Sequence, residues 1–153
     1  MSLPNVSADL IWEVTRAQNA YLVSRKTAPH TQFSRDPLNL LNVHSRKYAG
    51  YVNDKAIGIS PNEKGGVTVI SKKAGFANKP AAGTHTVTYG GNKTARKTYK
   101  GVASQTAKSG YRADLRQVAV ARASAIRKSQ RPVKATPEKK LRGPAAKRAA
   151  EEK

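Results

Sequence analysis

Positive charge is concentrated in one part of this 153-residue chain, and the polypeptide itself does not neutralise it. Residues 1–63 hold seven Lys and Arg against five Asp and Glu, whereas residues 64–153 hold 22 against four. Between Lys64 and Ala113 there is no acidic residue at all. Surface ion pairs need carboxylates, which this stretch lacks. Folding of the isolated chain therefore brings positive charges together, and their repulsion opposes the compact state. A large anionic partner is the simplest remedy.

Helical periodicity marks the N-terminus. Ser7 is a suitable helix cap and Asp9 lies in the first turn, where the helix dipole favours an acid. The apolar residues that follow at helical spacing are Leu10, Ile11, Val14 and Ala17. The pattern predicts a helix over residues 8–18. Trp12 projects away from this stripe, and we favour its packing against a second layer over its stacking on a nucleobase.

From residue 20 to residue 90 the pattern changes to short β-type runs punctuated by Pro, Gly and Asn. The runs are "AYLVS", "LLNV", "KYAGYV", "AIGIS", "VTVISKK" and "HTVTYG". Pro61 and the pair Gly65 and Gly66 mark a turn before the alternating run "VTVISKK". We predict a small antiparallel meander, with residues 72–85 forming a loop that reaches outwards.

Two basic amphipathic helices are predicted next, over residues 92–108, capped by Asn92, and over residues 112–130, stopped by Pro132. Their apolar positions are Ala95, Tyr99, Val102, Ala103 and Thr106 in the first helix, and Tyr111, Leu115, Val118, Ala119 and Ile126 in the second. An interior glycine, Gly101, weakens the first helix by about 1 kcal/mol.

Arg122 falls inside the apolar stripe of the second helix, and two interpretations of it stay open. In one, its aliphatic stem packs along the stripe while the guanidinium reaches water. In the other, the head group pairs with a phosphate at the edge of the domain. Both avoid burying an unpaired charge.

Residues 132–153 contain three prolines and seven basic residues with little apolar content. Such a composition cannot bury enough surface to offset its ordering entropy, so we expect this tail to be disordered when free. The sequence therefore predicts an α+β fold with a compact domain over residues 1–131 and an extended basic tail.

Catalytic and metal chemistry are poorly represented. The absence of cysteine excludes a zinc ribbon, a disulfide framework and a thiol nucleophile. None of His30, His44 and His85 has a metal-ligand spacing, and the scattered acids form no general acid and base pair. We expect no enzyme activity, cofactor or small-molecule substrate. No apolar run has the length of a membrane span and no signal-peptide pattern is present, so a cytosolic or nuclear location is expected.

The basic surface remains, and it predicts nucleic-acid binding through phosphate and sugar contacts. A merely solvated face is the alternative for any single residue, but solvated faces normally interleave acids. Tyr48, Tyr51, Phe76 and Tyr89 are candidates for stacking, although each also suits a core. The candidate RNA-binding residues are Lys72, Lys73, Lys79, Lys93, Arg96, Lys97, Lys100, Lys108, Arg112, Arg116, Arg122, Arg127, Lys128 and Arg131.

Three blocks of sequence resemble one family, the eukaryote-specific large-subunit ribosomal protein numbered twenty-eight. The blocks are "DLIWEVTRAQNAYLVSRK", "QFSRDPLNLLNVHSRKYAG" and "YRADLRQVAVARASAIRKSQRPV", in the family's order. The resemblance runs from about Ala8 to Lys134 and does not include the tail. Ala113 stands where family members often have a proline that opens the helix.

The resemblance implies a structural role in the large subunit of the cytoplasmic ribosome, with rRNA and neighbouring ribosomal proteins as partners and assembly in the nucleolus. A nucleolar assembly factor shares a related domain, but it carries cysteine-bearing and long acidic segments that this chain lacks. Two other functions compete with the ribosomal one. They are a protein-interaction or assembly module that docks through the first 63 residues, and chromatin-type DNA compaction suggested by the Ala, Lys and Pro of the tail.

Overall fold

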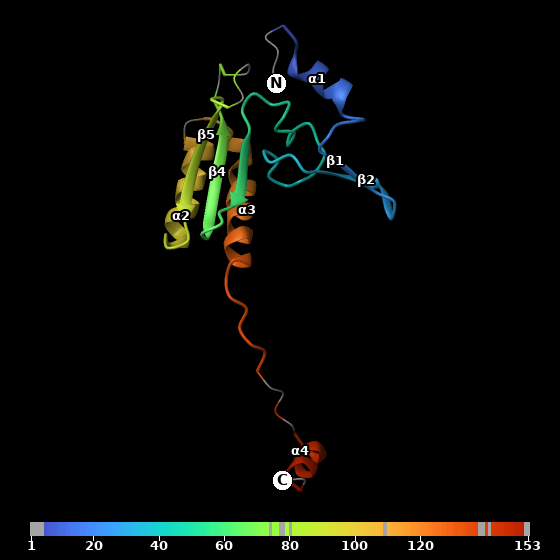
Figure 1. The fold of residues 1–153 in the computed structure, drawn as a ribbon, viewed down its shortest axis with the longest axis vertical. Coiled ribbons are helices and arrows are strands. Elements are labelled where there is room, and N and C mark those ends of the chain that lie inside the picture. The colour runs from blue at the N-terminus through green and yellow to red at the C-terminus, as the bar shows by residue number, and fades with distance from the viewer. Residues whose placement is uncertain are drawn as a thin grey trace.

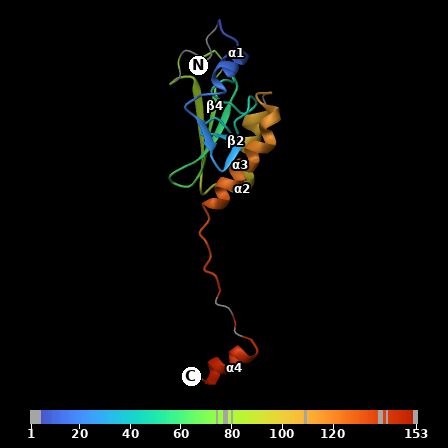
Figure 2. The same ribbon diagram turned by 90° about the vertical axis from the view of Figure 1, so that its right-hand side faces the viewer.

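The computed structural model describes residues 5–73, 75–76, 79, 81–108, 110–137, 140 and 142–151. It confirms the α+β class, because an N-terminal helix precedes two antiparallel sheets and a set of C-terminal helices. Figure 1 shows helices α2 and α3 covering one face of the larger sheet, and Figure 2 shows the same layers from the side.

The larger sheet is a three-stranded antiparallel meander of β3 (Ile57–Pro61), β4 (Gly66–Lys72) and β5 (Thr84–Gly90), in that order. The predicted meander is confirmed for these strands. The turn between β3 and β4 needs residues that tolerate positive φ, and Gly65 and Gly66 adopt φ values of 82° and 93°.

The smaller sheet pairs β1 (Leu22–Arg25) with β2 (Ala28–Ser34), a strand that sequence reasoning missed. The predicted β-type runs at 40–43 and 47–52 are not strands, apart from an isolated bridge between Val43 and Phe33.

Side chains of the segment between the two sheets explain why these runs form turns. Asp36 accepts hydrogen bonds from the backbone N–H of Leu38 and of Tyr51, both at 2.9 Å. Asn39 accepts from the N–H of Leu41 at 3.1 Å and donates to the carbonyl of Val43 at 2.9 Å. These side chains satisfy backbone groups that a neighbouring strand would otherwise satisfy, so the segment forms turns.

The two predicted basic helices exist, with shifted starts. Helix α2 (Ala95–Ala103) begins after Thr94 rather than Asn92, and it continues as a π-helical segment, η1 (Ser104–Lys108). A 3₁₀ turn, η2 (Ala113–Leu115), opens helix α3 (Arg116–Ser129).

The core lies between the larger sheet and the helix pair. Val67 and Val69 of β4 are fully buried, as are Ala119 and Ala123 of α3. The other buried members of this cluster are Leu40, Ile57, Ile59, Val102 and Leu115. The small side chains of α3 bring that helix close to the sheet. Gly101, inside α2, also allows close packing. A Cβ at this position would lie 2.7 Å from the ring of Tyr89.

Helix α1 (Ala8–Thr15) starts as predicted, with the Ser7 hydroxyl accepting a hydrogen bond from the N–H of Leu10 at 3.2 Å. It ends at Thr15, three residues before the predicted end. Its apolar stripe faces outwards, since Leu10 is 55% and Val14 72% exposed. The inner side instead carries Trp12, whose ring packs on that of His44 with 4.9 Å between centroids. Trp12 therefore packs against a second layer, as we favoured.

The tail contains one helix, α4 (Pro144–Glu151), which Figures 1 and 2 show well apart from the sheet and its helices. Disorder of the free tail stays a prediction. In the part of the chain that the structure describes, no helix is long and apolar enough to span a membrane.

Gly58, the second residue of β3, offers a test of how the segment between the two sheets packs on the larger sheet. A Cβ there would lie 2.2 Å from the carbonyl oxygen of Pro37, so Gly58→Ala must push the backbone of the loop away from the strand. We expect a loss of about 2 kcal/mol in the free energy of unfolding, measured by urea denaturation. Gly90→Ala is the matched control, because a Cβ at Gly90 meets nothing within 4 Å. Equal stability of the two variants would contradict this packing.

Candidate nucleic-acid interface

Ten of the fourteen predicted RNA-binding residues have exposed side chains. They are Lys73, Lys79, Lys93, Arg96, Lys97, Lys100, Lys108, Arg116, Lys128 and Arg131. Within the described ranges, none of these ten forms an ion pair with a carboxylate. The ion pairs present involve only Arg16, Arg46 and Arg112. The ten side chains, called the exposed cations below, therefore keep their charge unpaired on the surface of this part of the chain.

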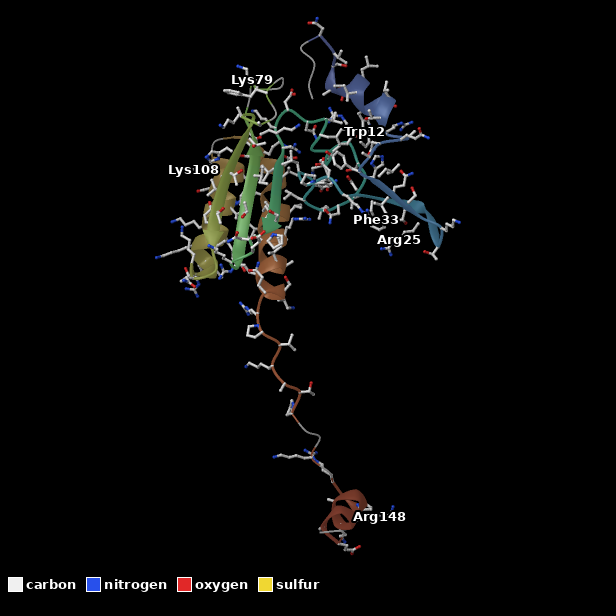
Figure 3. All side chains as sticks on the ribbon, in the orientation of Figure 1. Trp12, Arg25, Phe33, Lys79, Lys108 and Arg148 are labelled. Atoms are coloured by element: carbon white, nitrogen blue, oxygen red, sulfur yellow. The ribbon has the colours of Figure 1, made fainter. Side chains whose placement is uncertain are left out.

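The exposed cations follow particular elements of the fold. Lys93 precedes α2, and Arg96 and Lys97 lie in its first turn. Lys108 ends η1, and Figure 3 labels it together with Lys79, which lies in the loop beyond the ends of β4 and β5. No acidic residue is present between residues 64 and 113 to offset them. The two helices and the loop thus present a surface that attracts polyanions.

Four other predicted residues have internal partners. The ammonium group of Lys72 donates to the carbonyls of Asn53 at 3.0 Å and Tyr51 at 3.4 Å. Burial lowers the pKa of Lys72, and the nearby Asp36 and Asp54 oppose that shift. This lysine connects the end of β4 to the preceding loop.

Arg112 holds the start of the α3 region. It donates to both carboxylate oxygens of Asp114, each at 2.9 Å, and to the carbonyls of Lys55 and Lys47 at 2.9 and 3.2 Å. The hydrogen bonds to Asp114 raise the pKa of Arg112 and lower that of the carboxyl group. The only acid between residues 64 and 137 is thereby paired inside the domain.

Arg122 has acceptors inside the domain that neither interpretation included, and its pairing with a phosphate stays a prediction. Its guanidinium donates to the carbonyls of Ile59 and Leu40, both at 2.8 Å, and to the side-chain oxygen of Asn42 at 3.2 Å. Burial lowers its pKa. These hydrogen bonds therefore join α3 to β3 and to the segment between the two sheets. The position of Arg122 in the apolar stripe did not reveal these acceptors.

Arg127 also bonds within the domain, to the carbonyl of Gly91 at 3.2 Å and the hydroxyl of Thr98 at 3.4 Å. These contacts leave RNA contact by Lys72, Arg112, Arg122 and Arg127 a prediction. Because their donors already have acceptors, the interface is best built from the exposed cations.

Most of the predicted stacking residues contribute to packing. Tyr48 and Tyr89 pack against the core, and the Tyr51 hydroxyl lies 3.1 Å from that of Thr15. Phe76 is 43% exposed, with the ammonium group of Lys73 lying 5.8 Å from its ring centroid. Tyr48 and Tyr89 also have a lysine beside the ring, Lys47 at 5.6 Å and Lys93 at 5.2 Å, but both tyrosines are half-buried. Of the four, only Phe76 is exposed.

An open groove of about 590 Å³ lies between α2, η1 and α3. Its lining residues are Tyr99, Lys100, Ala103, Ser104, Ala107, Lys108, Arg116 and Val120. The predicted set included its three cations. Sequence reasoning missed the apolar lining, because the groove exists only once α3 is placed beside α2.

Two of the three histidines, His44 and His85, have described side chains, and neither belongs to a group of potential metal ligands among the described residues. The Nε2 atom of His44 lies 2.8 Å from the carbonyl oxygen of Arg16, while its ring packs on Trp12. His85 is exposed on β5, and the side chain of His30 lies outside the described residues. Over the described ranges, no three His, Asp or Glu side chains gather as metal ligands would.

Comparison with known proteins decides the family. Residues 10–129 match the ribosomal L28e protein family. The chain belongs to this family. The matched segment contains α1 from Leu10 onwards, both sheets and the whole of α2 and α3, so the resemblance seen in the three sequence blocks is confirmed.

Three relatives share the name large ribosomal subunit protein eL28. A protein of Schizosaccharomyces pombe named large ribosomal subunit protein eL28 is 44% identical over 131 residues, which cover 85% of this chain and 97% of the relative. A Dictyostelium discoideum protein of the same name is 32% identical over 129 residues, covering 84% and 92%. A third, from Caenorhabditis elegans, is 34% identical over 83 residues, covering 54% and 63%.

The free energy of unfolding can test which arginines of this L28e family member are bonded inside the domain and which are exposed. Arg122→Met leaves the acceptors on Ile59, Leu40 and Asn42 without their donor, so we expect a loss of about 2 kcal/mol in the free energy of unfolding. Arg116→Met, at an exposed position, should change it by less than about 0.5 kcal/mol. Urea denaturation of both variants decides the matter, and an Arg122 variant as stable as the parent would show that these hydrogen bonds are dispensable.

Proposed function

We propose that this chain is a structural, non-catalytic protein of the large ribosomal subunit that binds folded rRNA. The observation that carries the proposal is the set of ten exposed cations without a carboxylate partner among the described residues. Family membership and the names of the relatives support the ribosomal setting. The cytoplasmic ribosome, with assembly in the nucleolus, is the corresponding location.

The contacts proposed are to phosphate and sugar. Helices α2 and α3 fix the spacing of the cations that they carry, and the loop between β4 and β5 adds Lys73 and Lys79. Such contacts position a protein on RNA by shape, since they carry no base information. The tail beyond Pro132 adds further Lys and Arg that extend along RNA or neighbouring proteins.

Salt dependence of binding to purified large-subunit rRNA tests this function. The logarithm of the binding constant should fall steeply with the logarithm of salt, by about 0.7 to 0.9 per neutralised phosphate. The triple variant Lys93→Gln, Arg96→Gln, Lys97→Gln should lower that slope by about 2 to 3. A control triple, Lys26→Gln, Arg35→Gln, Lys55→Gln, removes equal charge from exposed positions outside this surface.

The proposal fails if the affinity is indifferent to salt, or if both triples change the slope equally. Duplex DNA as competitor separates rRNA binding from chromatin-type DNA compaction, since a clear preference for the DNA would favour the latter.

A second role, docking a neighbouring ribosomal protein, is favoured by the N-terminal region. Six of the eight large apolar side chains that the described residues expose fall between residues 10 and 43. On α1, Leu10 and Val14 accompany two acids, Asp9 and Glu13, and no base lies in the helix. Asp9 and Glu13 are paired with Arg46 and Arg16, but their side chains stay 85% and 62% exposed and can accept further donors. We propose that this face takes a protein segment of aliphatic side chains flanked by Lys and Arg.

Site-specific photo-crosslinking in purified large subunits tests this docking face. A benzoylphenylalanine at Val14 should give an adduct with one protein, mapping to an aliphatic and basic peptide, whereas the same group at Arg96 should give an adduct with rRNA. An RNA adduct at Val14, or none, would overturn the second role while leaving the first intact.

A further inference from the structure

The groove between α2, η1 and α3 has two different walls. One wall follows a single side of α2 and η1, where Lys100, Ser104 and Lys108 recur at every fourth residue. The other wall is the start of α3, with Arg116 and Val120 one turn apart. Ala103 and Ala107 lie between the cations of the first wall, and their small side chains leave the space open.

The rim of this groove is cationic. Lys100, Lys108 and Arg116 are exposed, and none forms an ion pair within the described residues. Asp114, the nearest acid along the chain to Arg116, is already held by the two hydrogen bonds from Arg112. The three charges are therefore available to an anion from outside the chain.

The floor of the groove is apolar. Tyr99 and Val120 pack against the core and also line the groove. Ala103 and Ala107 extend this surface. A phosphodiester backbone gains nothing from such a floor, whereas a flat heterocycle does. The π-helical turn of η1, which supplies Ser104, Ala107 and Lys108, is a form that occurs frequently at functional sites.

We infer that the groove binds an unpaired nucleotide of rRNA. Its base would lie on the apolar floor, and its flanking phosphates would pair with Lys100, Lys108 and Arg116. A base stacked inside a helix cannot reach such a floor, so the nucleotide must come from a bulge or loop. The inference rests on the rRNA-binding function proposed above and narrows it to one kind of RNA element.

Three short RNA hairpins of otherwise identical sequence test the site with the full chain. One is fully paired, one carries a single bulged adenosine, and one carries an abasic residue in the bulge. The bulged adenosine should bind about tenfold more tightly than the abasic form, because stacking of one base contributes about that much. The abasic and paired hairpins should bind similarly, with the same salt dependence.

Groove-filling variants supply the matched comparison. Ala107→Leu should remove the preference for the bulged adenosine without altering affinity for the paired hairpin. Ala121→Leu places the same side chain on an exposed position of α3 outside the groove and should change nothing. If Ala107→Leu unfolds, a 2-aminopurine placed in the bulge reports base burial in the unmodified protein through its fluorescence.

The outcomes separate this inference from the function on which it rests. Equal affinity for all three hairpins with a steep salt dependence would overturn the groove site and leave rRNA binding standing. Salt-independent binding to every hairpin would contradict the proposed rRNA-binding function itself. Free adenosine monophosphate is a further probe, and affinity for it equal to that for the bulged hairpin would show that the groove does not need RNA.

Discussion

The packing of α3 against the meander is the constraint on which the rest of the structure depends. Ala119 and Ala123 are fully buried against the sheet, and their small side chains let the helix backbone approach Val67 and Val69. That approach brings the guanidinium of Arg122 onto the carbonyls of Ile59 and Leu40. It also forms one wall of the groove, since Arg116 and Val120 lie on the same helix.

A chain this basic uses its cations in two ways. Lys72, Arg112, Arg122 and Arg127 donate to main-chain or side-chain oxygens and join segments that are distant in sequence. Each such bond replaces water around a charged group with a fixed acceptor, and charge-assisted bonds of this kind are stronger than neutral ones. Among the described residues the exposed cations donate to no such acceptor, so they are left for an anionic partner.

Local patterns anticipated the elements that local chemistry controls. The Ser7 cap, the meander from residue 57 to residue 90 and both basic helices follow from periodicity, turn residues and caps. The segment around Asp36 and Asn39 was misread, because its apolar run resembles a strand while its side chains bond the backbone in place of a neighbouring strand. The stripe of α1 was identified correctly as apolar, but its direction depends on the distant His44 and Tyr51.

The order of residues establishes where the charge lies, which residue types surround it and which segments are helical, since these depend on residues within a few positions of one another. Packing between elements establishes which cations bond inside the domain, which way α1 turns its apolar stripe, and that Lys100, Lys108 and Arg116 share one groove. These outcomes depend on contacts between residues far apart in the chain, and periodicity along a single element carries no information about its neighbours.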